Sequence, residues 1–320
     1  MNHLSFPEFL SRREAFDAAV AAQDEIAKFC SSSSWMCAAN GLLHASEGEG
    51  EPEYCIREHD GNWIVFVDRQ RRGIWFPLES AWMFDCPMIG EPAECVELLK
   101  QEGFATLQPT GFCIGGVRKE GELHRRLESL GEVGLRYEEF PATDCMIIEL
   151  WSGYEAWLER RSRKFRKSVR QLPVDDGIEM VDASGESPEV IFRRILAIQQ
   201  RTYKWQEGSD IFQGEDYLLF YRYLMETLSE AGRLRVMFAQ QDGEDVAYIL
   251  GGEFANQYRG LQMSYVESVR SSGIGNRLQL ENISRCAEAG MEAYDLGMHS
   301  EYKERWADRQ DAYITVFLVL

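Results

Sequence analysis

Residues 270–275 read RSSGIG and lie between a strand-like run at 259–266 and a helical pattern at 274–289. Glycine lets the main chain approach a bound group without a clash from Cβ, and the first amides and the dipole of a helix attract anions. Gly273 and Gly275 therefore predict a cradle for a pyrophosphate, to which Arg270 adds a charged donor. The alternative interpretation is a plain glycine-rich turn, because so short a string also arises by chance.

The second half of the chain, which contains this turn, is predicted to mix helices and strands. Apolar residues at three-to-four spacing predict helices, and β-rich runs predict strands. Helices are predicted at 151–172, 188–204, 215–231 and 274–289. Strands are predicted at 178–181, 234–239, 246–254, 259–266, 293–296 and 313–320.

The first half is also mixed, with helices predicted at 8–30 and at 91–102, the second one closed by Gly103. Strands are predicted within 54–75 and at 112–117, 134–140 and 146–150. The polar stretch 141–144 predicts a break in the chain. We therefore expect a domain boundary near residue 145.

Composition limits the class of protein. The 320 residues allow two domains of about 150 residues each, and 45% hydrophobic with 27% charged residues is typical of a folded chain. The net charge of −19 disfavours nonspecific nucleic-acid binding, because it repels phosphate backbones. The eight cysteines lack metal-ligand spacing, and no stretch is apolar enough for a membrane span or a signal peptide. We therefore expect a cytoplasmic protein with reduced cysteines and no metal site.

Several segments match a known pattern in the correct order. The string at 270–275 resembles the R/Q-x-x-G-x-G/A motif with which GNAT acyltransferases bind acyl-CoA. The helix at 273–290, AYDLG at 293–297, YKERW at 302–306 and WLERRSRKFRKSVRQL at 157–172 resemble the FemAB-like and BioF2-like (CelD-type) acetyltransferase branch of that superfamily. The resemblance covers about residues 146–312.

This resemblance implies an α/β (α+β) fold of two tandem GNAT-like domains, each a mixed central sheet flanked by helices. Residues 1–145 correspond to a degenerate domain without a pyrophosphate motif, and residues 146–320 to the catalytic domain. No permanently bound cofactor is implied. The co-substrate is acyl-CoA or an acyl-phosphopantetheine on an acyl carrier protein, and the acceptor is the amine of a small molecule or peptide.

The resemblance also implies which residues hold the donor. GNAT enzymes polarise the thioester carbonyl with a backbone amide on a central splayed strand, which corresponds to 264–266 in this chain. The expected donor-binding residues are Ser264, Tyr265, Val266, Arg270, Ser271, Ser272, Gly273, Ile274, Gly275 and Asn276.

Amine acylation needs a neutral nucleophile and a proton source for the leaving thiolate. Asp295 resembles the acidic position of the family's yDfG segment, so it could bind or deprotonate the amine, or instead cap the following loop. Lys303 matches the family's YK, and could hold the acyl carbonyl or a substrate anion while Tyr302 protonates the thiolate. The alternative for Lys303 is a solvated side chain.

Two further residues are candidate proton carriers. His299 is the only histidine of the second half, and an ordinary pKa of about 6.5 suits a general base at neutral pH. Glu253 ends the strand at 246–254, where many GNAT enzymes relay a proton through water. The alternatives are an incidental histidine and a solvated glutamate.

The segment 160–170 is strongly basic in an otherwise acidic chain. It holds Arg160, Arg161, Arg163, Lys164, Arg166, Lys167 and Arg170. This cluster is either a solvated face or a contact for an anion. The anion could be the 3′-phosphate of coenzyme A, the acidic helix of a carrier protein, or an acceptor such as a nucleotide-linked sugar.

The sequence thus predicts an N-acyltransferase of cell-envelope, polysaccharide or natural-product metabolism. One alternative is an aminoacyl-tRNA-dependent transferase of the FemAB type, against which the net charge and the intact motif at 270–275 argue. The other is a non-catalytic GNAT-like binding protein, against which both glycines and Lys303 argue. The acceptor, the acyl chain length and the oligomeric state stay open.

Overall fold

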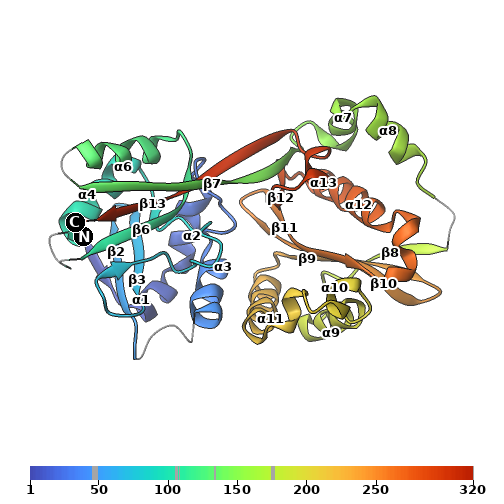
Figure 1. Ribbon diagram of the computed structural model, residues 1–320, viewed down its shortest axis with the longest axis horizontal. Helices are drawn as coiled ribbons and strands as arrows, with labels where there is room; N and C mark the ends of the chain where they lie inside the picture. The colour runs from blue at the N-terminus through green and yellow to red at the C-terminus, as the bar shows by residue number, and fades with distance from the viewer. Residues whose placement is uncertain (45–49, 105–106, 108, 133–134, 174–176, 320) are drawn as a thin grey trace. The chain divides into compact units, whose positions relative to one another are not determined.

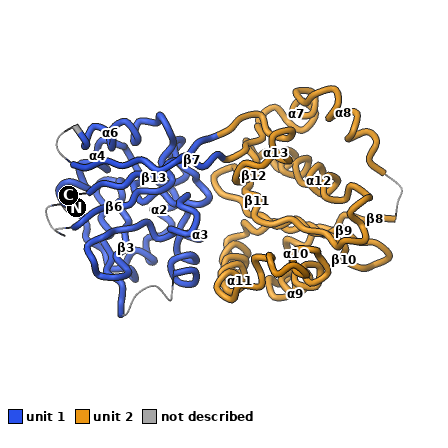
Figure 2. Tube along the Cα trace, viewed as in Figure 1, with its two compact units in different colours: residues 1–144, 311–320 blue, residues 145–310 orange. Residues whose placement is uncertain are grey.

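The computed structural model describes residues 1–44, 50–104, 107, 109–132, 135–173 and 177–319. The chain divides into two compact units, residues 1–144 with 311–320 and residues 145–310 (Figure 2). Strands β7 (Arg136–Glu149) and β13 (Arg309–Val319) each contribute to both units. The last residues, which the sequence assigns to the second domain, therefore pack in the first unit.

The first unit contains a small antiparallel sheet, with strands in the order β1 (Asn2–Leu4), β2 (Glu53–His59), β3 (Asn62–Asp68) and β5 (Met88–Ile89). A further strand, β6 (Gly111–Arg118), pairs with β4 (Ile74–Trp75) and with β13. The β2–β3 hairpin turns at Asp60-Gly61. Both residues have positive φ, which suits a two-residue hairpin turn.

The helices of the first unit differ from the predicted ones in extent. They are α1 (Phe6–Ser11), α2 (Arg13–Ala21), α3 (Ser33–Ala38), α4 (Pro92–Leu98) and α6 (Glu122–Glu132), with π-helical segments at Ala39–Leu43 and Leu99–Phe104. The single helix predicted at 8–30 is wrong, because the chain breaks at Arg12 and leaves the helical path after α2. There Ile26 forms a β-bridge with Val117.

The second unit holds a mixed sheet with strands in the order β7, β12 (Ala293–Met298), β11 (Gln257–Tyr265), β10 (Glu244–Phe254), β9 (Leu234–Gln241) and β8 (Ile178–Asp182). Neighbouring strands are antiparallel except β11 and β12, which are parallel. Parallel neighbours need a crossover, and helix α12 (Ile274–Glu288) supplies it.

Helices cover both faces of this sheet (Figure 1). One face carries α12 with α7 (Gly153–Arg160) and α8 (Arg163–Arg170). The other carries α9 (Pro188–Gln199), α10 (Tyr203–Gln206) and α11 (Glu215–Glu230). The short helix α13 (Glu301–Glu304) follows β12. This layered arrangement confirms the predicted α/β fold class.

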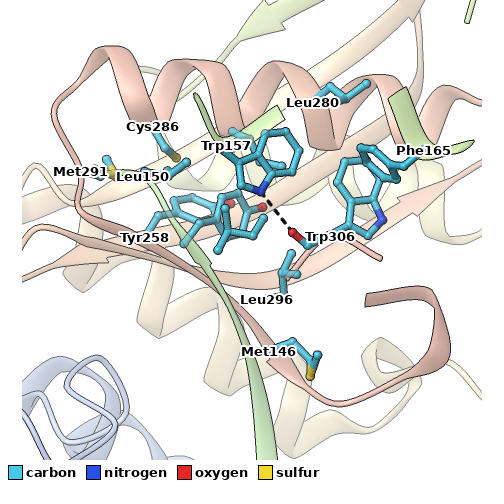
Figure 3. Packing of buried hydrophobic residues seen from close by; sticks show 13 residues of the cluster. Met146, Leu150, Trp157, Phe165, Tyr258, Leu280, Cys286, Met291, Leu296 and Trp306 are labelled. Carbon is cyan, nitrogen blue, oxygen red and sulfur yellow. Dashed lines mark hydrogen bonds between the residues drawn. The ribbon is translucent and has the colours of Figure 1, made fainter. Parts of the chain in front are cut away.

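A buried aromatic cluster ties α7 and α8 to the segment after α13 (Figure 3). The rings of Trp157 and Trp306 stack with centroids 6.2 Å apart, and Phe165 packs edge-on against Trp306 at 5.0 Å. Trp157 Nε1 donates to the Trp306 carbonyl oxygen at 3.2 Å, so the buried indole is satisfied. The cluster fixes both helices beside the end of β12.

The chain divides near the predicted boundary at residue 145, but two local features predicted around it are wrong. The helix predicted at 151–172 is interrupted at Arg161, because Ser162 accepts a hydrogen bond from the Phe165 amide at 3.1 Å and caps a new helix. The break predicted at 141–144 does not occur, because β7 continues through it. Residues 141–144 are exposed or half-buried, and burial begins at Cys145.

Candidate functional site

Strands β11 and β12 pair over only three residues and then separate. Their register ends at Arg259↔Asp295, although β11 continues to Tyr265 and β12 to Met298. A cavity of about 250 Å³ lies where the strands part. Its walls include residues 260–263 of β11, Tyr294 and Leu296 of β12, Lys204 of α10, and Tyr302 and Lys303 of α13.

The turn at Gly273 leads from a 3₁₀ segment, Glu267–Ser272, into α12. The φ angle of Gly273 is +71°, a left-handed conformation that favours glycine. A Cβ at this position would also lie 2.9 Å from Leu172 Cδ2. The backbone conformation therefore favours glycine here, and a larger residue would also displace the Leu172 side chain.

Two main-chain amides in the first turn of α12, both on buried residues, have no acceptor among the described residues. The amides of Asn276 and Arg277 donate to the Gly273 carbonyl oxygen at 3.0 and 3.2 Å. Within the described ranges, the amides of Ile274 and Gly275 donate to no backbone or side-chain oxygen. Because they lie at the positive end of the helix dipole, they can bind an anion.

Two side chains from the region of α13 lie beside this turn. Tyr302 Oη donates to Asn276 Oδ1 at 3.3 Å, and Arg305 Nη2 donates to the same oxygen at 3.0 Å. Burial raises the pKa of Tyr302 to about 12, so its hydroxyl keeps its proton at neutral pH. The exposed cation of Arg305 was missed from the sequence, although it lies within the YKERW segment.

Lys303 lines the cavity and lies near a second, buried cation. Its Nζ donates to the Met298 carbonyl oxygen at 2.8 Å. A Cβ placed on Gly297 would lie 3.6 Å from both Lys303 Nζ and an Arg259 guanidinium nitrogen. Burial, and then the charge of Arg259, lower the pKa of Lys303, which increases its neutral fraction.

Asp295 is engaged by the protein and does not line the cavity. Its carboxylate forms an ion pair with Arg259 and accepts the Gly297 amide at 2.7 Å. The predicted cap of the following loop is therefore present. The carboxylate holds Arg259 in place, and Arg259 is a residue that no sequence motif indicated.

The structure does not bring His299 and Glu253 to the cavity. His299 is exposed, and its Nε2 lies 2.7 Å from Glu304 Oε1. Glu253 accepts from Arg235 Nε at 2.6 Å and pairs in register with Tyr258, near the start of β11. Because β10 and β11 are antiparallel, Glu253 lies at the opposite end of β11 from the turn at Gly273.

The three predicted carbonyl-binding positions differ in what their amides can do. The Val266 amide is occupied, since it donates to the Val246 carbonyl oxygen of β10 at 2.8 Å. Successive amides of a strand point to opposite edges, so the Ser264 amide also faces β10 and the Tyr265 amide faces the separation from β12. Of the three, only Tyr265 directs its amide toward the separation.

Around the turn, the side chains predicted to bind the donor point in several directions. Arg270 is exposed, and its Nη1 lies 3.1 Å from Glu267 Oε1, which offsets its charge. Ser272 Oγ donates to the Val269 carbonyl oxygen at 2.7 Å, whereas Ser271 is exposed. The binding capacity of the turn therefore lies mainly in its backbone.

The described residues contain no group of three or more His, Cys, Asp or Glu side chains that could hold a metal ion. Among the described helices, none is long and apolar enough to cross a bilayer.

Residues 154–304 match the family model of the acetyltransferase (GNAT) domain. The match covers most of the second unit. The match begins in α7 and ends in α13, so it includes the turn at Gly273, the separated strands and the cavity between them. No curated protein sequence matches the chain.

Similarity to solved structures extends over the whole chain, beyond the residues that match the family model. FemX has a TM-score of 0.70 at 12% identity, with 100% of this chain and 98% of FemX covered. A protein of unknown function from Bacteroides thetaiotaomicron has a TM-score of 0.65 at 15% identity over 97% of each chain. A tandem GNAT protein from the clavulanic acid biosynthesis pathway has a TM-score of 0.51 at 10% identity, covering 98% of this chain and 96% of its own. The chain therefore has the fold of two tandem GNAT-like domains and resembles FemAB-like proteins.

Proposed function

We propose that the protein is an N-acyltransferase that moves an acyl group from a phosphopantetheine thioester to an amine. The observation that carries this proposal is the pair of amides, of Ile274 and Gly275, that have no acceptor among the described residues and lie at the start of α12 beside the separated strands. A pyrophosphate on these amides would place the pantetheine arm along the separation, with the thioester near the 250 Å³ cavity.

The residues at the cavity suit each part of the reaction. The Tyr265 amide, which faces the separation, donates to the carbonyl oxygen as negative charge develops. Neutral Lys303 accepts the proton that the amine loses as its nitrogen bonds to the carbonyl carbon. The C–S bond then breaks, and Tyr302 supplies a proton to the thiolate. Asp295 and Arg259 act indirectly, by positioning Lys303 and adjusting its charge.

Titration calorimetry with coenzyme A tests where the donor binds. Gly273→Asp adds a carboxylate and backbone strain at the start of α12, and we expect it to abolish binding. Gly290→Asp is the matched control, because Gly290 has φ +76° and open space around it at the other end of the same helix. It should bind coenzyme A as the wild type does.

Acyl transfer is tested by incubating the protein with acetyl- and longer acyl-CoA and pooled amines, and detecting the new amides by mass spectrometry. Products that depend on Lys303 would support the proposal. Binding of coenzyme A without any amide product would favour a non-catalytic GNAT-like protein. Failure of the wild type to bind coenzyme A, together with transfer from an aminoacyl-tRNA, would overturn the proposed donor.

A further inference from the structure

Helix α8 presents a row of exposed cations. Arg163, Lys164, Lys167 and Arg170 are exposed, and at 100° per residue they lie on one side of the helix, opposite the buried ring of Phe165. None of the four has a carboxylate within 4.0 Å in the part of the chain that the structure describes. We call these four side chains the α8 cationic face.

Four neighbouring cations without acidic partners stand out in a chain of this composition. The chain has 53 acidic and 34 basic residues, so its cations generally have carboxylates available. Just before α8, Arg160 and Arg161 both pair with Asp308, at 2.9 Å in the case of Arg160. The α8 cationic face is thus a local positive surface on a strongly negative protein, and it attracts an anion at short range.

The α8 cationic face is held in place by a cap and by packing, and it adjoins the turn at Gly273. Ser162 caps α8, and Phe165 packs into the cluster with Trp157 and Trp306. Just beyond α8, Leu172 Cδ2 lies 2.9 Å from the position of a Cβ on Gly273. The C-terminal end of the cationic face therefore adjoins the turn where the proposed function places the phosphates of the donor.

We infer that the α8 cationic face docks an acidic helix of an acyl carrier protein, which delivers the acyl group on its phosphopantetheine arm. This inference rests on the proposed function, because it names the form in which the thioester arrives. The arm would pass from the carrier, over the turn at Gly273, to the cavity between β11 and β12.

The dimensions favour a protein partner over a free coenzyme. From Arg163 to Arg170 the helix rises about 10 Å, so the cations form a row rather than a pocket around one phosphate. An acidic helix presents carboxylates with the same rise and periodicity as these cations. The ion pairs would then form at the exposed edge of the interface between the two proteins, where charge guides their association. RNA is disfavoured, because a long polyanion would also approach the acidic remainder of a chain with net charge −19.

The test compares a holo acyl carrier protein of the acidic, helical type with coenzyme A as ligands in titration calorimetry. Lys164→Glu/Lys167→Glu reverses the centre of the face. Lys119→Glu/Arg193→Glu makes the same change in net charge at two exposed cations outside it. We expect the first double variant to weaken carrier binding about tenfold or more with unchanged affinity for coenzyme A, and the control to bind both ligands normally.

The decisive experiment exchanges the charges between the α8 cationic face and the acidic helix of the carrier. A carrier in which two acidic helix residues are replaced by lysine should bind the Lys164→Glu/Lys167→Glu variant better than it binds the wild type. Equal carrier binding by wild type and variant, or coenzyme A binding without carrier binding, would overturn the inference and leave the proposed function intact. Binding of a short RNA hairpin that is lost in the same variant would assign the face to RNA instead. Failure to bind either thiol ligand would count against the proposed function as well.

Discussion

Arg259 and Asp295 face each other in the last register pair of β11 and β12 before these strands separate, and the buried Arg259 forms an ion pair with the partly buried Asp295. The pair closes the narrow end of the separation. Burial lowers the pKa of Lys303, and the nearby positive charge of Arg259 lowers it further. The carboxylate of Asp295 opposes this shift. One contact between strands therefore links the stability of the sheet to the chemistry of the cavity.

Removing the cation of this pair should destabilise the protein. Arg259→Met leaves the Asp295 carboxylate partly buried without its charged partner, so we expect a loss of about 3–5 kcal/mol in the free energy of unfolding. Urea denaturation measures it. The double variant Arg259→Met/Asp295→Leu should recover part of the loss, because it leaves no unpaired charge. Equal stability of Arg259→Met and wild type would contradict this account.

Lys303→Gln should remove a pH-dependent step from acyl transfer. The folded-state pKa of Lys303 lies below the unfolded value of 10.5, so the neutral amine becomes available at a lower pH than for an ordinary lysine. In the wild type, we expect kcat to rise with pH through this lowered pKa. In Lys303→Gln, we expect this rise to be absent. A pH profile of kcat for both proteins decides the point.

The same shift has a consequence for stability. The unfolded chain binds more protons than the folded one between the lowered pKa and 10.5, so this group makes the protein more stable as pH rises through that window. Lys303→Met should remove this contribution to the slope. Denaturation midpoints of the two proteins across the window measure the difference, which should vanish if Lys303 has the same pKa in both states.

Tyr302→Phe should reduce turnover without unfolding the protein. The substitution keeps the ring, which lies 5.9 Å from that of Trp306, and removes the hydroxyl that donates to Asn276. We expect kcat to fall by about 10²–10⁴-fold, the usual contribution of a general acid, with little change in the affinity for coenzyme A. Steady-state kinetics with calorimetry measure both. A loss of coenzyme A affinity with kcat retained would instead make Tyr302 a binding residue.

The aromatic cluster should be essential for the position of α7 and α8. Trp157→Ala leaves a large cavity against Trp306 and Phe165, so we expect a loss of about 3–5 kcal/mol in stability. Trp157→Phe is a milder comparison, because the Trp306 carbonyl oxygen keeps a hydrogen bond from Arg161 at 2.8 Å. In thermal unfolding, we expect the wild type to be the most stable, Trp157→Phe to be intermediate and Trp157→Ala to be the least stable.

Local sequence signals determined the strands, most helices and the glycine turn of this protein. Gly273 marks the start of α12 because its left-handed backbone favours glycine, and the β2–β3 hairpin follows from Asp60-Gly61. Helix ends were less predictable. Ser162 is one of many serines, and its role as a cap depends on where the buried Phe165 has to point.

Only the tertiary structure decided which functional side chains meet. Glu253 and His299 looked equivalent to Lys303 in the sequence, yet antiparallel pairing sends Glu253 to the far end of β11, and His299 lies on the surface. Arg259 carried no motif, because its importance comes from Asp295, 36 residues later, across a parallel pair. Local conformation depends on near neighbours and can be inferred from the chain alone, whereas charge and proton transfer depend on distances that exist only after distant segments have packed together.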